Sequence, residues 1–454
     1  MTADTEKKIT ERQVLQLWQT QQVGGSAMFT EEGEPLRILY PGRPNDSHGA
    51  DFRDAAITLG NQTLRGDIEV HIKSSDWLAH RHHQDPFYDA VILHVVMWHD
   101  ITRTPPRHDG RPMPTLALSK YLNVSPPRVV EPSDYFSQFP ACLQGESVTE
   151  ELLAMMGAVR FQLKTAQFEI QLSRIDDSEC LYQGVMEALG YSQNQSPFRK
   201  LAQRMPLRVL EMLHHQEASA ADRLMRIQSR LLGTAGLLPS QCSQYRNSLS
   251  LEWAALESEW LRYDQSQAMS PHAWHLFRLR PNNSPLRRIA AMSHLLLRYP
   301  EGLLAGAMTL VQKADDYRRL EQGLIVTIRG EGPGHTAPLT LLGRERAGEI
   351  IINVILPFLY AWSRINARTE VADKAFSFYQ NYPRLGSNTV EKHMISQLGL
   401  SRRRVNSAQH QQGLIHIYKS FCTQGECASC PLHHHQASRK LGTTSRSSPS
   451  DLPA

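Results

Sequence analysis

One short stretch of the chain carries an acid, an imidazole and an amine at alternate positions. Residues 66–77 read Gly-Asp-Ile-Glu-Val-His-Ile-Lys-Ser-Ser-Asp-Trp. If this stretch is a β-strand, Glu69, His71 and Lys73 share one face, and the apolar residues between them share the other. Metal-dependent phosphodiester cleavage needs carboxylates that bind a divalent ion, beside a base or cation that manages water and developing charge. The stretch therefore predicts a site for this chemistry.

Asp51 supplies the second carboxylate that such a site requires. The Gly60-Asn61 pair between Asp51 and Glu69 is typical of a hairpin turn, so the two acids should stand on adjacent strands and converge. We expect Asp51 and Glu69 to bind Mg²⁺ or Mn²⁺, with His71 or Lys73 as the positioning cation or base.

Histidines are dense around this predicted strand, since eight of the twenty in the chain lie between residues 48 and 108. The run from His80 to His83 offers further metal ligands or phosphate contacts, although a polar loop has the same composition. Asp76, His80, His82 and His94 are therefore additional candidates for the site. His94 lies inside an apolar run, and either it reaches the same site or it is a hydrogen-bonded core residue.

Three interpretations of the Glu69 strand remain open. It is part of a nuclease site, it binds a metal without nuclease activity, or it is an amphipathic edge strand with a solvated polar face. The run from Ala90 to Trp98 is apolar on both faces, which is typical of a central strand covered on each side. The position of Glu69 between Asp51 and this run favours the first interpretation.

A cysteine cluster near the end of the chain is a second candidate metal site. Cys422, Cys427 and Cys430 have the spacing C-x4-C-x2-C, and His433 follows closely. These thiolates can bind zinc as Cys3His with His433 or a neighbouring histidine, or an iron–sulfur cluster with a fourth ligand from elsewhere. Buried thiols without a metal are the alternative. The other cysteines are scattered, unlike the dense framework of a secreted disulfide protein.

The elements that position these residues change in character along the chain. Thr10 to Val23 has helical apolar spacing with Thr10 as a plausible N-cap, short β-rich runs follow, and helical spacing dominates from about residue 147. We predict an α+β protein whose small mixed sheet belongs to an N-terminal α/β domain. The predicted parts are this domain (1–135), a helical domain (145–335), a helical C-terminal part with the cysteines (340–435) and a disordered tail (436–454).

Composition limits the class of protein. The 454 residues exceed the usual size of one hydrophobic core, and a net charge of +4 is far from that of a protein that coats nucleic acid. The first residues lack the apolar stretch of a secretory signal. The most apolar run, residues 350–362, is shorter than a membrane span and contains Asn353 and Pro357, which favours a buried helix. We expect a cytoplasmic protein with no membrane partner, and the oligomeric state stays open.

Two basic segments lie outside the N-terminal domain. Residues 391–405 predict two helices joined at Gly399, with arginines opening the second helix, a layout that DNA-reading helices share. A helical hairpin with a solvated basic end is the alternative. Residues 278–288 are a second candidate for phosphate contact, or an ordered interdomain turn.

The motif around Asp51 and Glu69 resembles that of the PD-(D/E)XK nuclease superfamily. The resemblance implies a restriction-endonuclease-like core. In that core a helix and strands come first, an Asp precedes one strand, and a (D/E)-X-K lies on the next strand. A helix and a central strand then complete the core. It also implies divalent-metal-dependent cleavage of nucleic acid. Ala50 stands where the superfamily often has Pro, and His71 takes the usual Lys position, which leaves Lys73 as a displaced amine. Some nucleases of this superfamily also carry an iron–sulfur cluster.

Nearly the whole chain also resembles an uncharacterised bacterial family, domain of unknown function 2851. The matching words include Gly49-x-Asp51-Phe, the run from Glu69 to Trp77, Arg280-Pro and Cys427-x-x-Cys430. This resemblance implies one integrated architecture and is silent about activity. A non-catalytic nucleic-acid- or protein-binding factor with a structural metal site is therefore the alternative to a nuclease.

Overall fold

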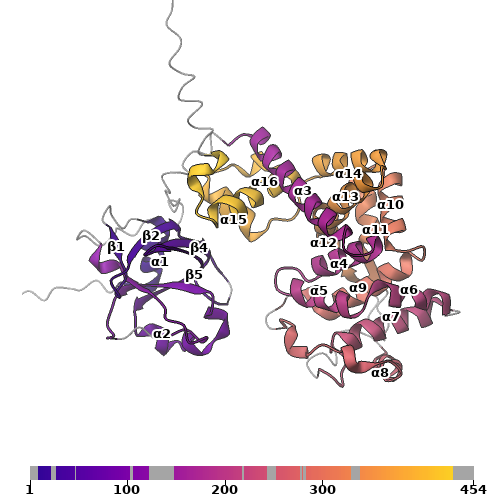
Figure 1. Cartoon of the computed structure of the whole chain (residues 1–454), viewed down its shortest axis with the longest axis horizontal. Helices are drawn as coiled ribbons and strands as arrows, with labels where there is room; N and C mark the ends of the chain where they lie inside the picture. Colours follow the sequence, from indigo (N-terminus) through magenta and orange to yellow (C-terminus); the bar gives the residue numbers. More distant parts are fainter. Residues whose placement is uncertain are drawn as a thin grey trace, which may run out of the picture. The chain divides into compact units, whose positions relative to one another are not determined.

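The computed structural model describes residues 9–21, 27–46, 48–102, 106–121, 148–216, 219–242, 252–276, 279, 283–328 and 338–432 (Figure 1). His433 and the tail predicted over 436–454 lie outside these residues. The chain divides into two compact units. Unit 1 comprises residues 1–157, 387–406 and 410–454, and unit 2 comprises residues 158–386 and 407–409.

Unit 1 is built on a mixed sheet, as predicted, and a helical region follows it in the chain. The strands are ordered β1-β2-β4-β5-β6-β7, with β3 also paired to β4. Pairing is antiparallel from β1 to β5 and parallel from β5 to β7. The strands are β1 (Met28–Phe29), β2 (Pro35–Tyr40), β3 (Arg43–Pro44), β4 (Phe52–Leu59), β5 (Gln62–Lys73), β6 (Val91–Trp98) and β7 (Thr115–Ala117).

Helix α1 (Glu11–Thr20) packs against one face of this sheet. It begins where the sequence predicts, because Thr10 and Gln13 form a reciprocal capping box that satisfies backbone donors of the first turn. Its buried side chains, Val14, Leu17 and Trp18, share one core with the apolar side chains of β5. The apolar half of the alternating β5 pattern is therefore core.

The opposite face of β5 is covered by the connection to β6. This connection contains α2 (Asp76–Ala79) and two 3₁₀ turns, η1 (His82–Gln84) and η2 (Pro86–Tyr88). Trp77 and Tyr88 are buried there with Ala50, Val91 and Met113 in a small apolar cluster. Glu69 and His71 are consequently buried, at 5% and 1% exposure, so their face of the strand is not solvated.

The C-terminal elements of the chain pack on the same sheet within unit 1. The Tyr40 hydroxyl on β2 lies 2.6 Å from His393 Nε2 on α15 (Thr389–Gln397). The Tyr418 hydroxyl donates to Asp54 Oδ2 at 2.7 Å from a π-helical turn, η11 (Tyr418–Cys422), that follows α16 (Ala408–Ile417). These bonds tie the end of the described chain to β2 and β4.

The predicted second helix after Gly399 begins later than the sequence pattern indicates. Arg402–Arg404 form an isolated 3₁₀ turn, η10, capped by the Ser401 side chain, and the helix starts only at Ala408. The Arg404 guanidinium donates to the backbone carbonyl of Val148 at 2.9 Å. The arginines therefore do not open a recognition-type helix, because a local cap and a tertiary contact hold them in a turn.

Unit 2 is helical, with one small antiparallel sheet. The long helix α3 (Glu150–Leu172) leads the chain into it. Its elements are α4 (Asp177–Leu189), α5 (Gln195–Arg204), α6 (Leu207–Gln216), α7 (Ala220–Thr234), α8 (Trp253–Trp260), α9 (Pro285–Arg298), α10 (Leu303–Lys313), α11 (Tyr317–Leu324), β8 (Val326–Ile328), β9 (Leu339–Leu342), α12 (Arg344–Ile350), η9 (Ile351–Ile355), α13 (Leu356–Ile365) and α14 (Thr369–Asn381).

The most apolar run of the chain is a continuous helix of unit 2. Residues 344–365 are long and apolar enough to cross a membrane, but 67% of the tested window is buried inside the structure, and core helices pass the same test. The middle of this helix is π-helical. Pro357 has no N–H to offer the Asn353 carbonyl one turn back, and the Lys164 ammonium donates to that carbonyl at 3.3 Å.

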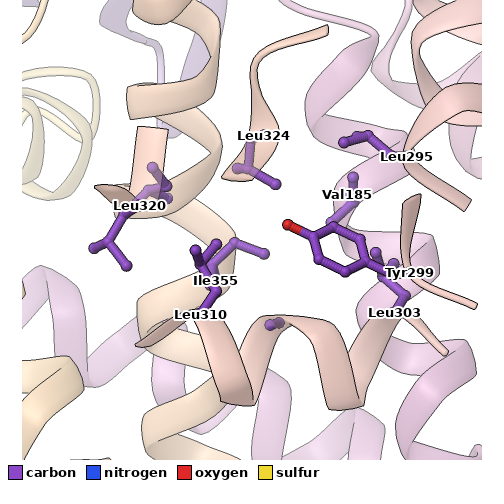
Figure 2. Close-up of a pocket in the computed structure, with 10 residues that line it drawn as sticks. Val185, Leu295, Tyr299, Leu303, Leu310, Leu320, Leu324 and Ile355 are labelled. Atoms are coloured by element: carbon purple, nitrogen blue, oxygen red, sulfur yellow. The ribbon is translucent and has the colours of Figure 1, made fainter. Parts of the chain in front are cut away.

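An apolar cavity of about 10 Å³ lies in the core of unit 2 (Figure 2). Leucines of α9, α10 and α11 surround it, and the hydroxyl of Tyr299 donates to the Gly323 carbonyl at 2.8 Å. A cavity of this volume holds one water molecule at most. We therefore regard it as a packing gap and not as a ligand site.

Candidate metal site on the sheet of unit 1

Asp51 and Glu69 meet at the junction of β4 and β5. The Asp51 N–H donates to Glu69 Oε2 at 3.1 Å, and the Val70 N–H donates to Asp51 Oδ2 at 3.0 Å. The antiparallel register that aligns Phe52 with Ile68 brings the two acids together. The convergence expected from the hairpin is therefore present.

A bulge in β4 sets the position of Asp51, and it depends on residues that the sequence analysis did not select. The pairing of β4 with β5 shifts between Phe52 and Ala55, and Asp54 within this bulge has φ of 61°. Asp67 stabilises the bulge, because its carboxylate accepts from the Asp54 N–H and pairs with the Arg53 guanidinium. The sequence did contain a signal, since Asp67 shares the strand face of Glu69.

Two histidines lie beside Glu69 Oε1, and a third lies beside one of them. His71 Nε2 lies 3.5 Å and His82 Nε2 lies 3.3 Å from this oxygen, and His80 Nδ1 lies 3.1 Å from His71 Nε2. One ring nitrogen from each of His71, His80 and His82 falls within 4.8 Å of the other two. His71 Nδ1 faces His94 Nε2 at 2.9 Å, and His94 is fully buried on the neighbouring strand β6.

Aromatic rings fix the loop side of this cluster. The ring of His82 stacks on that of His71, with centroids 5.2 Å apart and planes 10° from parallel. The ring of Tyr88 also lies beside that of His82, with centroids 3.9 Å apart. Trp77 contacts both His82 and His94. His80 is exposed and His82 is half-buried, so the cluster is covered by the protein on the sheet side and reached from the loop side.

Burial makes the charged forms of these groups unfavourable. It raises the pKa of Glu69 to about 8, and it raises the pKa of Asp51 to about 7 together with the charge of Glu69. Burial, reinforced by the neighbouring histidines, lowers the pKa of His71 to about 2. Burial likewise lowers the pKa of His94 to about 3. The site thus presents neutral imidazoles and carboxylates that gain from an added positive charge.

Two of the predicted site residues stand apart from this cluster. Lys73 is exposed at the end of β5, where its backbone N–H donates to Asp76 Oδ2 at 2.9 Å. Against the effect of burial, hydrogen bonds from Ser75 lower the pKa of Asp100, and the Lys73 ammonium adds a smaller lowering. Within the described chain, no hydrogen bond or ion pair joins Lys73 or Asp76 to Asp51 or Glu69.

The predicted cysteine ligands occupy a different region of unit 1. Cys422 and Cys430 are buried in a core that also contains Tyr40, and Cys427 is half-buried at the start of a 3₁₀ turn, η12 (Cys427–Ser429). Gly425 turns the chain between them with φ of 72°, against the side chain of Leu39. A zinc ion or an iron–sulfur cluster at these cysteines stays a prediction.

Fold and site together define a mixed α+β protein with a buried cluster of acids and histidines on its sheet. The chain belongs to the family described as Protein of unknown function (DUF2851), whose sequence model matches residues 11–386. A search of curated proteins and a search of solved structures each gave no significant match. Residues 387–432, which follow the family match, belong to unit 1 for the most part.

Proposed function

We propose that this protein is a divalent-metal-dependent nuclease. The observation that carries the proposal is the convergence of Asp51 and Glu69, from neighbouring strands, beside His71. Carboxylates of this kind can hold a divalent ion against a phosphate, and burial strengthens their interaction with it.

The order of elements supports the same function. Helix α1, strands β2, β4 and β5, helix α2 and strand β6 follow one another in the sequence, and β5 pairs parallel with β6. This is the order that the resemblance to PD-(D/E)XK nucleases implies. The departure lies at the amine, because His71 is buried at the Lys position while Lys73 lies at the exposed end of the strand.

The residues of the site have separate roles in the proposed hydrolysis. A bound divalent cation supplies Lewis-acid polarisation of the phosphate and a water of lowered pKa. Glu69 would hold the cation, and Asp51, which is hydrogen-bonded beside it, would accept the proton of the attacking water. The water oxygen bonds to phosphorus as the ester P–O bond breaks, and the leaving alkoxide takes a proton from solvent.

A cleavage assay with matched variants tests this proposal. Purified full-length protein is incubated with labelled single- and double-stranded DNA and RNA in the presence of Mg²⁺, Mn²⁺, Co²⁺ or Zn²⁺. We expect Glu69→Gln and Asp51→Asn each to lose about 100-fold or more in rate. Glu34→Gln changes an exposed glutamate in the turn between β1 and β2 and should leave the rate unchanged. Absence of cleavage with every ion and substrate, or full activity in Glu69→Gln, would rule the proposal out.

A further inference from the structure

We infer that the cation of this site is a divalent transition metal of the zinc class, bound by His71 Nε2, His80 Nδ1, His82 Nε2 and Glu69 Oε1. The inference deepens the proposed function, because it assigns the metal on which that function rests. It also stands on its own geometry, which concerns metal binding whether or not the protein cleaves nucleic acid.

Three separations among the four atoms are close to those around a tetrahedral ion. Zinc binds imidazole nitrogen and carboxylate oxygen at about 2.0–2.2 Å, which places tetrahedral ligand atoms about 3.3–3.5 Å from one another. Glu69 Oε1 lies 3.5 Å from His71 Nε2 and 3.3 Å from His82 Nε2, and His80 Nδ1 lies 3.1 Å from His71 Nε2. The three imidazoles each place a ring nitrogen within 4.8 Å of the other two, and Glu69 lies outside this group, so its carboxylate must move toward His80 for one ion to contact all four atoms.

Hydrogen bonds alone satisfy this arrangement less well than an ion does. His71 Nε2 faces both Glu69 Oε1 at 3.5 Å and His80 Nδ1 at 3.1 Å, yet one imidazole nitrogen either donates or accepts a single in-plane hydrogen bond. A cation interacts favourably with all the electron pairs at once. His71 Nδ1 is then left to donate to His94 Nε2, the outer hydrogen bond that fixes the orientation of metal-binding histidines.

The types of ligand select the class of metal. Magnesium prefers oxygen atoms in octahedral geometry and retains several waters, whereas imidazole suits zinc and the neighbouring transition metals. Three imidazoles and one carboxylate therefore favour a metal of the zinc class over the oxygen-preferring Mg²⁺ or Mn²⁺ expected from the sequence alone.

The loop backbone is shaped to present two of the ligands together. Arg81, between His80 and His82, has φ of 61° and ψ of 27°, a left-handed conformation that is uncommon for residues other than glycine. This conformation reverses the chain locally and lets both flanking imidazoles reach the cluster. Such backbone outliers concentrate at ligand-binding and active sites, where surrounding contacts maintain them.

Metal titration of the full-length protein tests the inference. The protein is stripped with a chelator and titrated with Co²⁺ and Zn²⁺, and binding is followed by the visible absorption of tetrahedral Co²⁺, by calorimetry and by elemental analysis. We expect one high-affinity equivalent at the histidine cluster, and its loss in His80→Ala distinguishes it from any metal bound by the cysteines of the same unit. His80→Ala should weaken binding by about 100-fold or more, beyond the effect of losing an outer-shell partner.

His83→Ala is the matched control. His83 lies in the same 3₁₀ turn, η1, as His82 but is not one of the three clustered histidines. Glu69→Gln should also bind more weakly than wild type and lose intensity in the Co²⁺ spectrum. Equal affinity in His80→Ala and His83→Ala, or no tetrahedral Co²⁺ signal in wild type, would overturn the assignment. Cleavage that depends on Mg²⁺ without such a signal would overturn it while leaving the nuclease in place. A bound transition metal without any cleavage would uphold it and refute the nuclease.

Discussion

Two buried glutamates, one in each unit, show different ways of compensating a carboxylate. Glu259 in unit 2 is 4% exposed, and guanidinium nitrogens of Arg226, Arg230 and Arg262 lie 3.5–3.6 Å from its oxygens. Glu69 in unit 1 is 5% exposed. Its nearest ionisable neighbours, however, are histidines, and within the described chain no lysine or arginine forms an ion pair with it.

The contrast separates a structural charge from a site. Unit 2 supplies its own cations, so Glu259 completes a closed electrostatic network. Unit 1 places a second acid and two histidines beside Glu69, and in the proposed site a bound cation would compensate its charge. Buried groups with perturbed pKa values, arranged around one point, define a candidate functional site.

The largest expected effect comes from supplying a divalent cation to the cluster around Glu69. Zn²⁺ at a free concentration one thousand times its Kd should raise the free energy of unfolding of wild-type unit 1 by about 4 kcal/mol, because the ion binds only the folded cluster. Denaturation of chelator-treated and zinc-loaded protein measures the gain. In His82→Ala, zinc should raise the free energy of unfolding by almost nothing. An equal gain in both proteins would contradict metal binding at this cluster.

Removing the acid in unit 2 should have a comparable but opposite consequence. Glu259→Gln leaves Arg230, which is mostly buried, without its partner, and should lower the free energy of unfolding by about 3 kcal/mol. Urea denaturation checks the value. Arg262→Ala is the control, because its side chain is 71% exposed and its pair with Glu259 should contribute at most about 0.5 kcal/mol.

A half-buried histidine that is not part of the site sharpens the comparison through pH. Burial, aided by Arg43, lowers the pKa of His393 to about 4. A histidine with a folded pKa below its unfolded value contributes stability above pH 6.5 and loses it as the pH falls towards 4. We expect His393 alone to account for a loss of roughly 2–3 kcal/mol over this range, measured as the difference between the pH profiles of wild type and His393→Gln. An unchanged acid profile in the variant would show that other groups govern it.

The smallest expected effect concerns the displaced amine. Lys73→Ala removes an exposed ammonium that lies apart from the acid and histidine cluster, and should change stability by less than about 0.5 kcal/mol. Its cleavage rate, measured beside that of Lys120→Ala as an exposed control, should remain within about twofold of wild type, a change of about 0.4 kcal/mol in the barrier. A large loss of cleavage rate would support the role predicted from the sequence, in which Lys73 is the positioning cation or base.

Local signals were sufficient for the elements that carry the site. The Thr10 cap, the turn at Gly60-Asn61 and the apolar run of β6 each specify their structure through nearby residues, and the hairpin then brings Asp51 to Glu69. The bulge at Asp54 was not predicted, because it depends on Asp67 and Tyr418, which reach it from another strand and from the end of the chain.

The sequence by itself determined which side chains share the Glu69 face, because alternation along a strand is a property of the backbone. It did not determine whether that face is solvated or buried, since a solvated strand and a covered strand have the same alternation. Only the tertiary structure decided this, by folding the loop of Trp77, His80 and His82 over Glu69 and His71 and by leaving Lys73 exposed. The physical reason is that burial depends on contacts between segments distant in sequence, which no local pattern encodes.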